Sequence, residues 1–396
     1  MGRTLIPFAE AMAIVLGEVR GLSTQRVGLL SAVGRVLAEE LRTDMDFPPF
    51  DKACMDGFAC RREDLGGRLH VVETVPAGRL PTLALGPGEA ARIMTGAMIP
   101  AGADVVFMVE YSESGEDGGV RFNGIETEDN IARCGEDLRS GAPVLAAGTL
   151  LEARHVAVLA SVGAAEPLVA CQPRVGIIAT GDELVEPAEM PGPGQIRNSN
   201  SFQLMAQVAQ SGAQPVYYGI AADSDEAIEG ALRRAMSEND VVLLSGGVSM
   251  GDFDLVPAVM KRCGFDILFD QVTVKPGKPV TFATSAEAVC FGVPGNPVSA
   301  YVVFEVFVRP YLMACMGRGA VAAEVSVKLA RSLQRRRTER LEFVPVRLNE
   351  QGEAEPVLYH GSAHFFALSQ ADGLVEIPVG VATVAAGTSV LVRWLR

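Results

Sequence analysis

Four segments of the chain combine glycines with side chains that bind phosphate or a cation. They run over 179–184, 245–254, 274–279 and 292–299, and we expect each to follow a strand. Glycines let a backbone approach an anion, hydroxyls donate hydrogen bonds, lysines neutralise charge, and carboxylates hold Mg²⁺ against phosphate oxygens. Together the four segments predict a phosphate site.

The candidate residues come from all four segments. One such loop alone is more often a plain strand-to-helix turn, but four of them on one sheet reverse that preference. Neither common nucleotide fingerprint is present. No Gly-x-Gly-x-x-Gly follows a predicted strand, and Pro279 after Gly277 and Lys278 removes the hydroxyl of a P-loop. We expect metal ligands among Asp182, Glu183, Asp252 and Asp254. Substrate contacts are expected at Thr180, Ser245, Gly246, Gly247, Ser249, Pro294, Gly295 and Asn296, with Lys275 and Lys278 as cations.

Alternating strands and helices should position these loops. Beyond residue 173 the pattern predicts strands at 174–179, 215–220, 240–244 and 289–292, and helices at 200–210, 224–237, 255–262 and 298–313. This alternation indicates a three-layer α/β domain with a mostly parallel sheet covered on both faces. Ligands of such sheets bind beyond the carboxyl ends of the strands.

The rest of the chain is predicted to be mostly β. The fold class is therefore multidomain α/β plus β: the α/β domain, a small β domain, a mixed linking domain and a C-terminal β-barrel-like domain. An amphipathic helix near the N-terminus joins the α/β domain. The expected boundaries are 1–22 and 171–318 for the α/β domain, 23–44 and 138–170 for the linking domain, 45–137 for the small β domain, and 319–396 for the C-terminal domain.

Composition restricts the class of protein. The chain has 396 residues, a net charge of −14 and 48% hydrophobic residues, which suits a soluble globular protein without a basic face for nucleic acid. Its seven cysteines form no Cys-x-x-Cys pair, as expected in a reducing cytosol. The N-terminal helix is neither a signal peptide nor a membrane span, so we predict a cytoplasmic protein with no membrane or nucleic-acid partner.

A basic region interrupts this acidic chain. Over 318–347 the cations outnumber Glu324, Glu339 and Glu342, and Arg340 is a candidate for holding an oxyanion. For Arg335 to Arg337 the preferred interpretation is a solvated strand face or a dimer contact. The cations of the region are Arg318, Lys328, Arg331, Arg335, Arg336, Arg337, Arg340 and Arg347.

Ordered motifs along the whole chain resemble one family. They are segments 49–59, 92–97 with Pro100 and 102–104, 135–137, 180–184, 245–249 and 294–299. Their sequences are similar to those of molybdopterin molybdenumtransferase, the MoeA and gephyrin E-domain family. The resemblance implies an elongated four-domain protomer and a homodimer, whose active cleft joins the α/β domain of one subunit with the small β domain of the other.

The resemblance also implies the reaction. Adenylated molybdopterin and molybdate give the molybdenum cofactor and AMP with Mg²⁺, and the upstream adenylyltransferase and apo-molybdoenzymes are further candidate partners. The resemblance also implies that the α/β domain is the one that binds molybdopterin. Carried over by motif position, the site residues are Asp56, Thr95 and Asp137 from the small β domain, Glu183, Asp223, Asp254, Lys275 and Lys278 from the α/β domain, and Arg340 and Ser362 from the C-terminal domain.

Two departures from the family pattern bear on substrate contacts. Ala53 and Cys54 stand where relatives have Ser and Ala, and Gln271 stands where many have a basic residue. Asp56 also has a plain interpretation as the cap of a tight Asp-Gly turn. Two other functions stay open, a molybdopterin adenylyltransferase-type activity and a non-catalytic molybdopterin-binding scaffold or carrier, and so does the choice between molybdate and tungstate.

Overall fold

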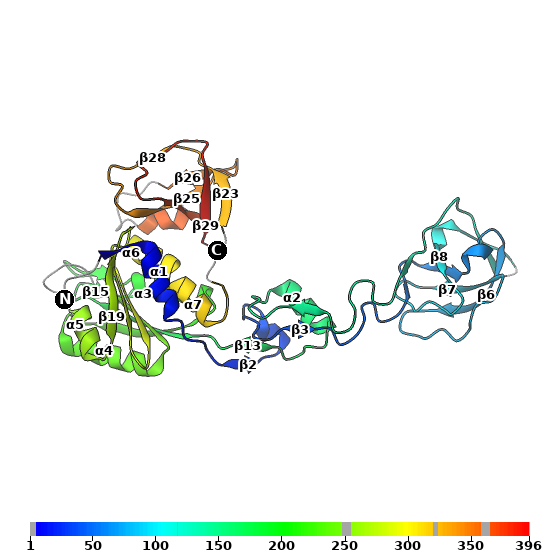
Figure 1. Cartoon of the computed structure of the whole chain (residues 1–396), viewed down its shortest axis with the longest axis horizontal. Helices are drawn as coiled ribbons and strands as arrows, with labels where there is room; N and C mark the ends of the chain where they lie inside the picture. The colour runs from blue at the N-terminus through cyan, green and yellow to red at the C-terminus, as the bar shows by residue number, and fades with distance from the viewer. Residues whose placement is uncertain (1–4, 117, 248–254, 320–323, 358–364, 396) are drawn as a thin grey trace. The chain divides into compact units, whose positions relative to one another are not determined.

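The computed structural model describes residues 5–116, 118–247, 255–319, 324–357 and 365–395 (Figure 1). Four of the predicted site residues lie outside the described ranges: Ser249, Asp252, Asp254 and Ser362. The chain forms two compact units: residues 1–38, 147–152 and 166–396 make the first, and residues 39–146 and 153–165 make the second. The predicted four-domain boundaries stay a prediction.

A seven-stranded sheet forms the centre of the first unit. Six strands run in one direction and β21 runs against its two neighbours, which confirms the predicted mostly parallel sheet. In spatial order the strands are β1 (Leu5–Ile6), β19 (Asp266–Val272), β21 (Pro279–Thr284), β22 (Val289–Val293), β18 (Val241–Ser245), β14 (Arg174–Thr180) and β17 (Gln214–Ala221). The hairpin of β19 and β21 was not predicted.

Helices cover this sheet because its central strands are apolar on both faces. In β14 every residue from Val175 to Thr180 is buried, and two separate hydrophobic clusters pack against the sheet. Figure 1 shows α1 and α7 within this unit, and the two helices are in contact. The helices are α1 (Phe8–Gly17), α3 (Asn200–Gln210), α4 (Asp225–Glu238), α5 (Val256–Arg262), α6 (Pro297–Val303) and α7 (Arg309–Cys315).

The segment Pro297–Cys315 is one continuous apolar helix, with a π-helical turn over Phe304–Val308 between α6 and α7. Among the described residues it alone is long and apolar enough to cross a membrane, but 78% of its most apolar stretch is buried inside the protein. Its composition is therefore explained by its place in the core.

A second sheet in the first unit is built from the C-terminal residues. Its path runs from β20 (Val274–Lys275) through β25 (Leu341–Leu348), β27 (Gly373–Ile377) and β29 (Ser389–Trp394) to β23 (Glu324–Lys328), and β26 (Ala354–Pro356) pairs with β25. Because β20 follows β19 directly, the two sheets are joined through residues 272–275. Two short pairs complete the β structure, β15 (Leu184–Val185) with β16 (Ile196–Arg197) and β24 (Leu333–Gln334) with β28 (Thr383–Val384).

The second unit contains a six-stranded mixed sheet, which lies within the segment predicted as a small β domain. Its order is β8 (Val105–Met108), β5 (Gly57–Cys60), β7 (Glu89–Ile93), β6 (Arg68–Val75), β10 (Gly119–Phe122) and β9 (Ser112–Ser114). The predicted linking segment gives short pairs in both units, and helix α2 (Ala153–Ser161) belongs to the second. The pairs of the linking segment are β2 (Thr24–Arg26) with β13 (Leu168–Ala170) and β3 (Leu41–Arg42) with β12 (Pro143–Leu145). A further pair, β4 (Lys52–Ala53) with β11 (Ile131–Ala132), lies in the predicted small β domain. The observed architecture matches the predicted multidomain α/β plus β class.

Candidate functional site

Loops after three strands of the seven-stranded sheet meet at one edge. The side-chain amide of Asn200, at the start of α3, donates to the Ser245 hydroxyl at 3.0 Å and to the Gly295 carbonyl at 2.8 Å. Thr180 ends β14 beside Gly246. We call Thr180, Asn200, Ser245, Gly246 and Gly295 the strand-end site. All five lie at the carboxyl edge, where ligands of such sheets bind.

Two glycines keep this site open. Gly246 and Gly247 have φ of +99° and +62°, which favours glycine. A Cβ on Gly246 would lie 2.6 Å from the Thr180 carbonyl oxygen, and a Cβ on Gly247 would lie 2.9 Å from Val256. Side chains at these positions would therefore overfill the space next to Thr180.

The Thr180 hydroxyl is buried without a hydrogen-bond partner in the described structure, although Thr180 is only 3% exposed. An unpaired buried hydroxyl costs about 1–3 kcal/mol, so a bound ligand that pairs with it would recover that energy. This orphaned group agrees with the predicted substrate contact at Thr180.

Two carboxylates, which we call the carboxylate pair, stand next to the strand-end site. The backbone N–H of Asp182 donates to Asp223 at 3.3 Å, and the backbone N–H of Asp223 donates to Asp182 at 3.1 Å. Both side chains are exposed, and within the described ranges neither forms an ion pair. Glu183 follows Asp182 and folds back over Gly181. Carboxylates held together without a cation suit a divalent ion.

The predicted cationic turn, residues 274–279, lies at the same edge of the sheet. Because β19 runs parallel to β22, β18, β14 and β17, its carboxyl end meets theirs. We call this segment the lysine turn. Lys275 pairs with Glu342 at 2.7 Å, whereas the Lys278 ammonium has no ion-pair partner in the part of the chain described.

The C-terminal sheet brings Arg340 to the lysine turn. Its guanidinium donates to the carbonyl of Val274 at 3.4 Å, so Arg340 reaches the backbone of the lysine turn. The interpretation of Arg335 as part of a solvated face is wrong. Its side chain is 8% exposed and donates to the carbonyls of Arg340 at 2.8 Å, Val381 at 2.6 Å and Pro378.

Two further arginines of the basic region have structural partners. Arg331 and Arg347 both pair with Glu355, at 2.8 Å and 2.7 Å. Glu355 lies on β26 beyond the segment in which the basic region was counted. The excess positive charge of the basic region is therefore smaller than the sequence suggests.

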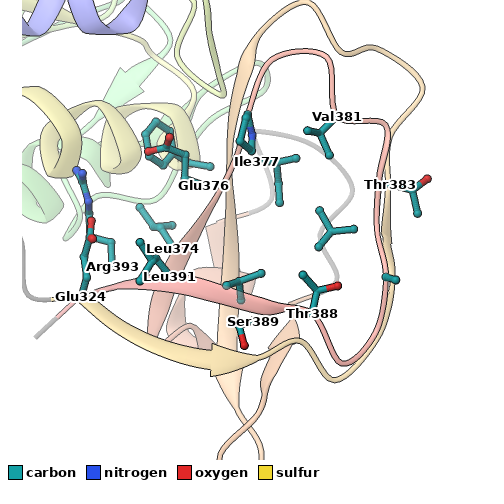
Figure 2. Close-up of a pocket in the computed structure, with 15 residues that line it drawn as sticks. Glu324, Leu374, Glu376, Ile377, Val381, Thr383, Thr388, Ser389, Leu391 and Arg393 are labelled. Carbon is teal, nitrogen blue, oxygen red and sulfur yellow. The ribbon is translucent and has the colours of Figure 1, made fainter.

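The C-terminal domain also contains two cavities. One, of about 610 Å³, has apolar walls that include Leu374, Ile377 and Leu391, with Glu324 and Arg393 toward one end (Figure 2). The other, of about 260 Å³, is lined in part by Arg335 and Glu342. The second cavity adjoins Glu342, which contacts Lys275 of the lysine turn.

In the second unit the structure brings Asp56 and Thr95 together. Asp56 accepts hydrogen bonds from the Thr95 hydroxyl at 2.6 Å and the Thr95 backbone N–H at 2.7 Å. These bonds, with a smaller contribution from Arg92, lower the pKa of the exposed Asp56 carboxyl. Asp137 lies on another loop, where its backbone N–H donates to Phe47, and no described hydrogen bond joins its side chain to this pair.

The residues that depart from the family pattern have distinct environments. Ala53 is buried on β4, opposite Ile131, and Cys54 is exposed before Asp56. Gln271 is buried on β19 between β1 and β21. Residue 53 therefore supplies a buried methyl group to a hydrophobic cluster and no hydroxyl.

Sequence reasoning did not assign Asn200, Arg335 or Glu342 to the site. The sequence pattern predicts Asn200 only as the first residue of the helix at 200–210, and its contacts with Ser245 and Gly295 join loops that are far apart in the sequence. Glu342 was counted merely as a competing acid. Its alignment with Lys275 depends on the pairing of β20 with β25, which the sequence pattern does not reveal.

Comparison with known proteins covers nearly the whole chain. Residues 6–163 match the MoeA N-terminal region (domains I and II), residues 176–314 match a probable molybdopterin binding domain, and residues 326–395 match the MoeA C-terminal region (domain IV). These three regions define a multidomain protein of the MoeA type.

Individual relatives of this chain support the same family assignment. A molybdopterin molybdenumtransferase of Synechococcus elongatus is 37% identical over 99% of this chain and 100% of its own, and one of Bacillus subtilis is 39% identical over 78% of this chain and 75% of its own. The crystal structure of a molybdopterin biosynthesis MoeA protein from Pyrococcus horikoshii is 32% identical, with a TM-score of 0.86 over 99% of this chain and 100% of that one.

The chain belongs to the molybdopterin molybdenumtransferase family. This membership confirms the family predicted from the motifs, and with it the enzyme class, a transferase of molybdenum cofactor biosynthesis.

Proposed function

We propose that the protein transfers molybdenum from molybdate to adenylated molybdopterin and releases AMP. The observation that carries this proposal is the convergence at one sheet edge of the strand-end site, the carboxylate pair and the lysine turn with Arg340. These are groups for a pyrophosphate, a divalent ion and a small oxyanion.

The strand-end site would bind the substrate. Its glycines let the backbone approach the substrate, and the hydroxyls of Thr180 and Ser245 donate to it. Asn200 holds Ser245 and the Gly295 carbonyl together, so it positions both loops. Lys278, with Lys275 and Arg340, would orient molybdate and neutralise charge that develops as the pyrophosphate bond breaks.

The carboxylate pair fits Mg²⁺. The described residues contain no group of three or more His, Cys, Asp or Glu side chains that could hold a metal. Mg²⁺ commonly uses only one or two carboxylates and completes its shell with water and substrate phosphates. Asp182 and Asp223 would hold it with Glu183 adjacent, and when bound it supplies a Lewis acid for pyrophosphate cleavage.

The second unit has a role in the same proposal. Asp56 and Thr95 form a polar pair on an exposed turn, and we assign them to substrate positioning in the cleft of a homodimer, together with Asp137. We place the protein in the cytoplasm, consistent with seven unpaired cysteines. The upstream adenylyltransferase and apo-molybdoenzymes are the further partners that this function requires.

The experiment supplies adenylated molybdopterin and Mg²⁺ and measures AMP with and without molybdate. The proposal predicts molybdate-dependent AMP release. An adenylyltransferase would instead consume ATP and molybdopterin. A scaffold or carrier would bind molybdopterin tightly, and Glu183→Ala would leave AMP production unchanged.

A further inference from the structure

A buried carboxylate already forms an ion pair with one cation of the proposed oxyanion site. The Glu342 side chain is 9% exposed, and its Oε1 lies 2.7 Å from the Lys275 ammonium. Its Oε2 lies 3.4 Å from the Arg335 guanidinium. Lys275 is 43% exposed, so the pair stands between the interior of the C-terminal domain and solvent.

The backbone fixes this contact. Strand β20 pairs in parallel with β25, so that Val274 lies opposite Leu341 and Lys275 opposite Glu342. The Leu341 N–H also donates to the carbonyl of Thr273 at 3.0 Å. Glu342 is therefore held beside Lys275 by strand register as well as by charge.

Arg335 does not depend on Glu342 as its main acceptor. Its guanidinium donates to three backbone carbonyls, and its contact with Glu342 is the longest of its four contacts. The carboxylate of Glu342 consequently acts chiefly on Lys275, and Arg335 keeps its hydrogen bonds when that charge is removed.

We propose that Glu342 sets the anion affinity of the oxyanion site, acting through Lys275. The inference rests on the proposed function, since it assumes that Lys275 faces the oxyanion. In the free protein Glu342 orients Lys275 and neutralises its charge. An entering oxyanion must compete with this built-in anion for the ammonium, so Glu342 weakens the binding of small anions, and it weakens a dianion more than a monoanion.

The test measures the binding of molybdate and perrhenate to the full-length protein by calorimetry, with saturating adenylated molybdopterin, low salt and no Mg²⁺, so that binding is measured without turnover. Both anions are tetrahedral, but molybdate carries two charges and perrhenate one. Glu342→Gln should tighten molybdate about tenfold and perrhenate about threefold, because the Coulomb energy scales with the charge of the ligand. Added salt should reduce both gains.

Two single variants and one double variant control for other causes of a change in anion affinity. Glu355→Gln removes a carboxylate that also pairs with two cations in the same domain, Arg331 and Arg347, and should leave both affinities unchanged. Glu342→Asp keeps the charge and should restore binding close to that of the wild type. In a Lys275→Met background, Glu342→Gln should lose most of its effect, because the residue acts through Lys275.

The outcomes separate the two claims. If the wild type binds molybdate and Glu342→Gln binds it equally or more weakly, the inference about Glu342 is overturned and the proposed function stands. An equal gain for both anions, or the same gain in Glu355→Gln, also overturns it. If the wild type binds no molybdate, the proposed function fails and the inference fails with it. Thermal unfolding of each variant verifies that the C-terminal domain is folded.

Discussion

The carboxylate pair and the lysine turn lie on one edge of the same sheet, but their charges are balanced differently. Asp182 and Asp223 hold each other's backbone N–H groups and have no described cation. Lys275, by contrast, already has the buried carboxylate of Glu342. The first region has uncompensated charge before any ligand arrives, whereas in the second region one of the two lysines is already neutralised.

This difference indicates two modes of ligand binding. Neighbouring carboxylates repel each other, so a divalent cation relieves an unfavourable state when it binds. At Lys275 an oxyanion must replace or share an existing partner. We therefore expect strong dependence on a divalent ion in the first region and only moderate binding of anions at Lys275 in the second.

The largest effect should come from removing charge in the carboxylate pair. Asp182→Asn and Asp223→Asn should each lower the rate of AMP release at least about 100-fold, because the charge that holds Mg²⁺ is halved. Thermal unfolding without divalent ions should be unchanged or shifted upward, since the amide oxygen still accepts the neighbour's N–H. Mg²⁺ should raise the unfolding temperature of the wild type only, and an equal rise in both variants would contradict the assignment.

Substitutions of Lys278 and Lys275 should differ in their effect on molybdate use, because only Lys275 has an ion-pair partner in the described residues. Lys278→Met should raise the molybdate concentration for half-maximal turnover about thirtyfold, as expected for losing a charged hydrogen bond. Lys275→Met should raise it only about threefold, because Glu342 already neutralises that lysine. Steady-state kinetics at varied molybdate measures both, and the reverse order would refute the contrast between them.

A smaller effect is expected at the buried hydroxyl of the strand-end site. Thr180→Val keeps the shape and removes a hydroxyl that has no described partner, so the free energy of unfolding should stay the same or rise. Affinity for adenylated molybdopterin should fall about five- to tenfold, since a neutral hydrogen bond is lost. Calorimetry and chemical denaturation measure the two quantities. A loss of stability without a loss of affinity would make Thr180 structural.

The smallest effect concerns Asp56 in the second unit. Thr95 lowers its pKa, so the resulting stability is present at neutral pH and is lost as the pH falls through the lowered pKa. Thr95→Val should move the pKa of Asp56 back toward its ordinary value, as measured by NMR titration. The stability difference between the wild type and Asp56→Asn should vanish in acid, and a difference that persists there would have another cause.

Strong periodic patterns made much of the fold predictable. The helix expected at 200–210 has those bounds as α3, and the strand expected at 174–179 extends by one residue as β14. Their apolar residues leave few alternatives to burial. The loops after these strands were also predicted to form one site, because carboxyl ends of parallel strands share an edge.

Contacts that depend on strand register were not predictable in this way. The acids Asp266 and Asp270 obscure β19, so its antiparallel hairpin with β21 gave no clear pattern. Glu342 meets Lys275 only because β20 joins the C-terminal sheet. Arg335 stands in a run of three arginines typical of a solvated face, yet backbone carbonyls enclose it.

The most direct test of the account is AMP release from adenylated molybdopterin by the purified full-length protein with Mg²⁺, with and without molybdate. The account predicts AMP and molybdenum cofactor in equal amounts when molybdate is present, and only background AMP without it. AMP release that is absent, or that does not depend on molybdate, would contradict the account.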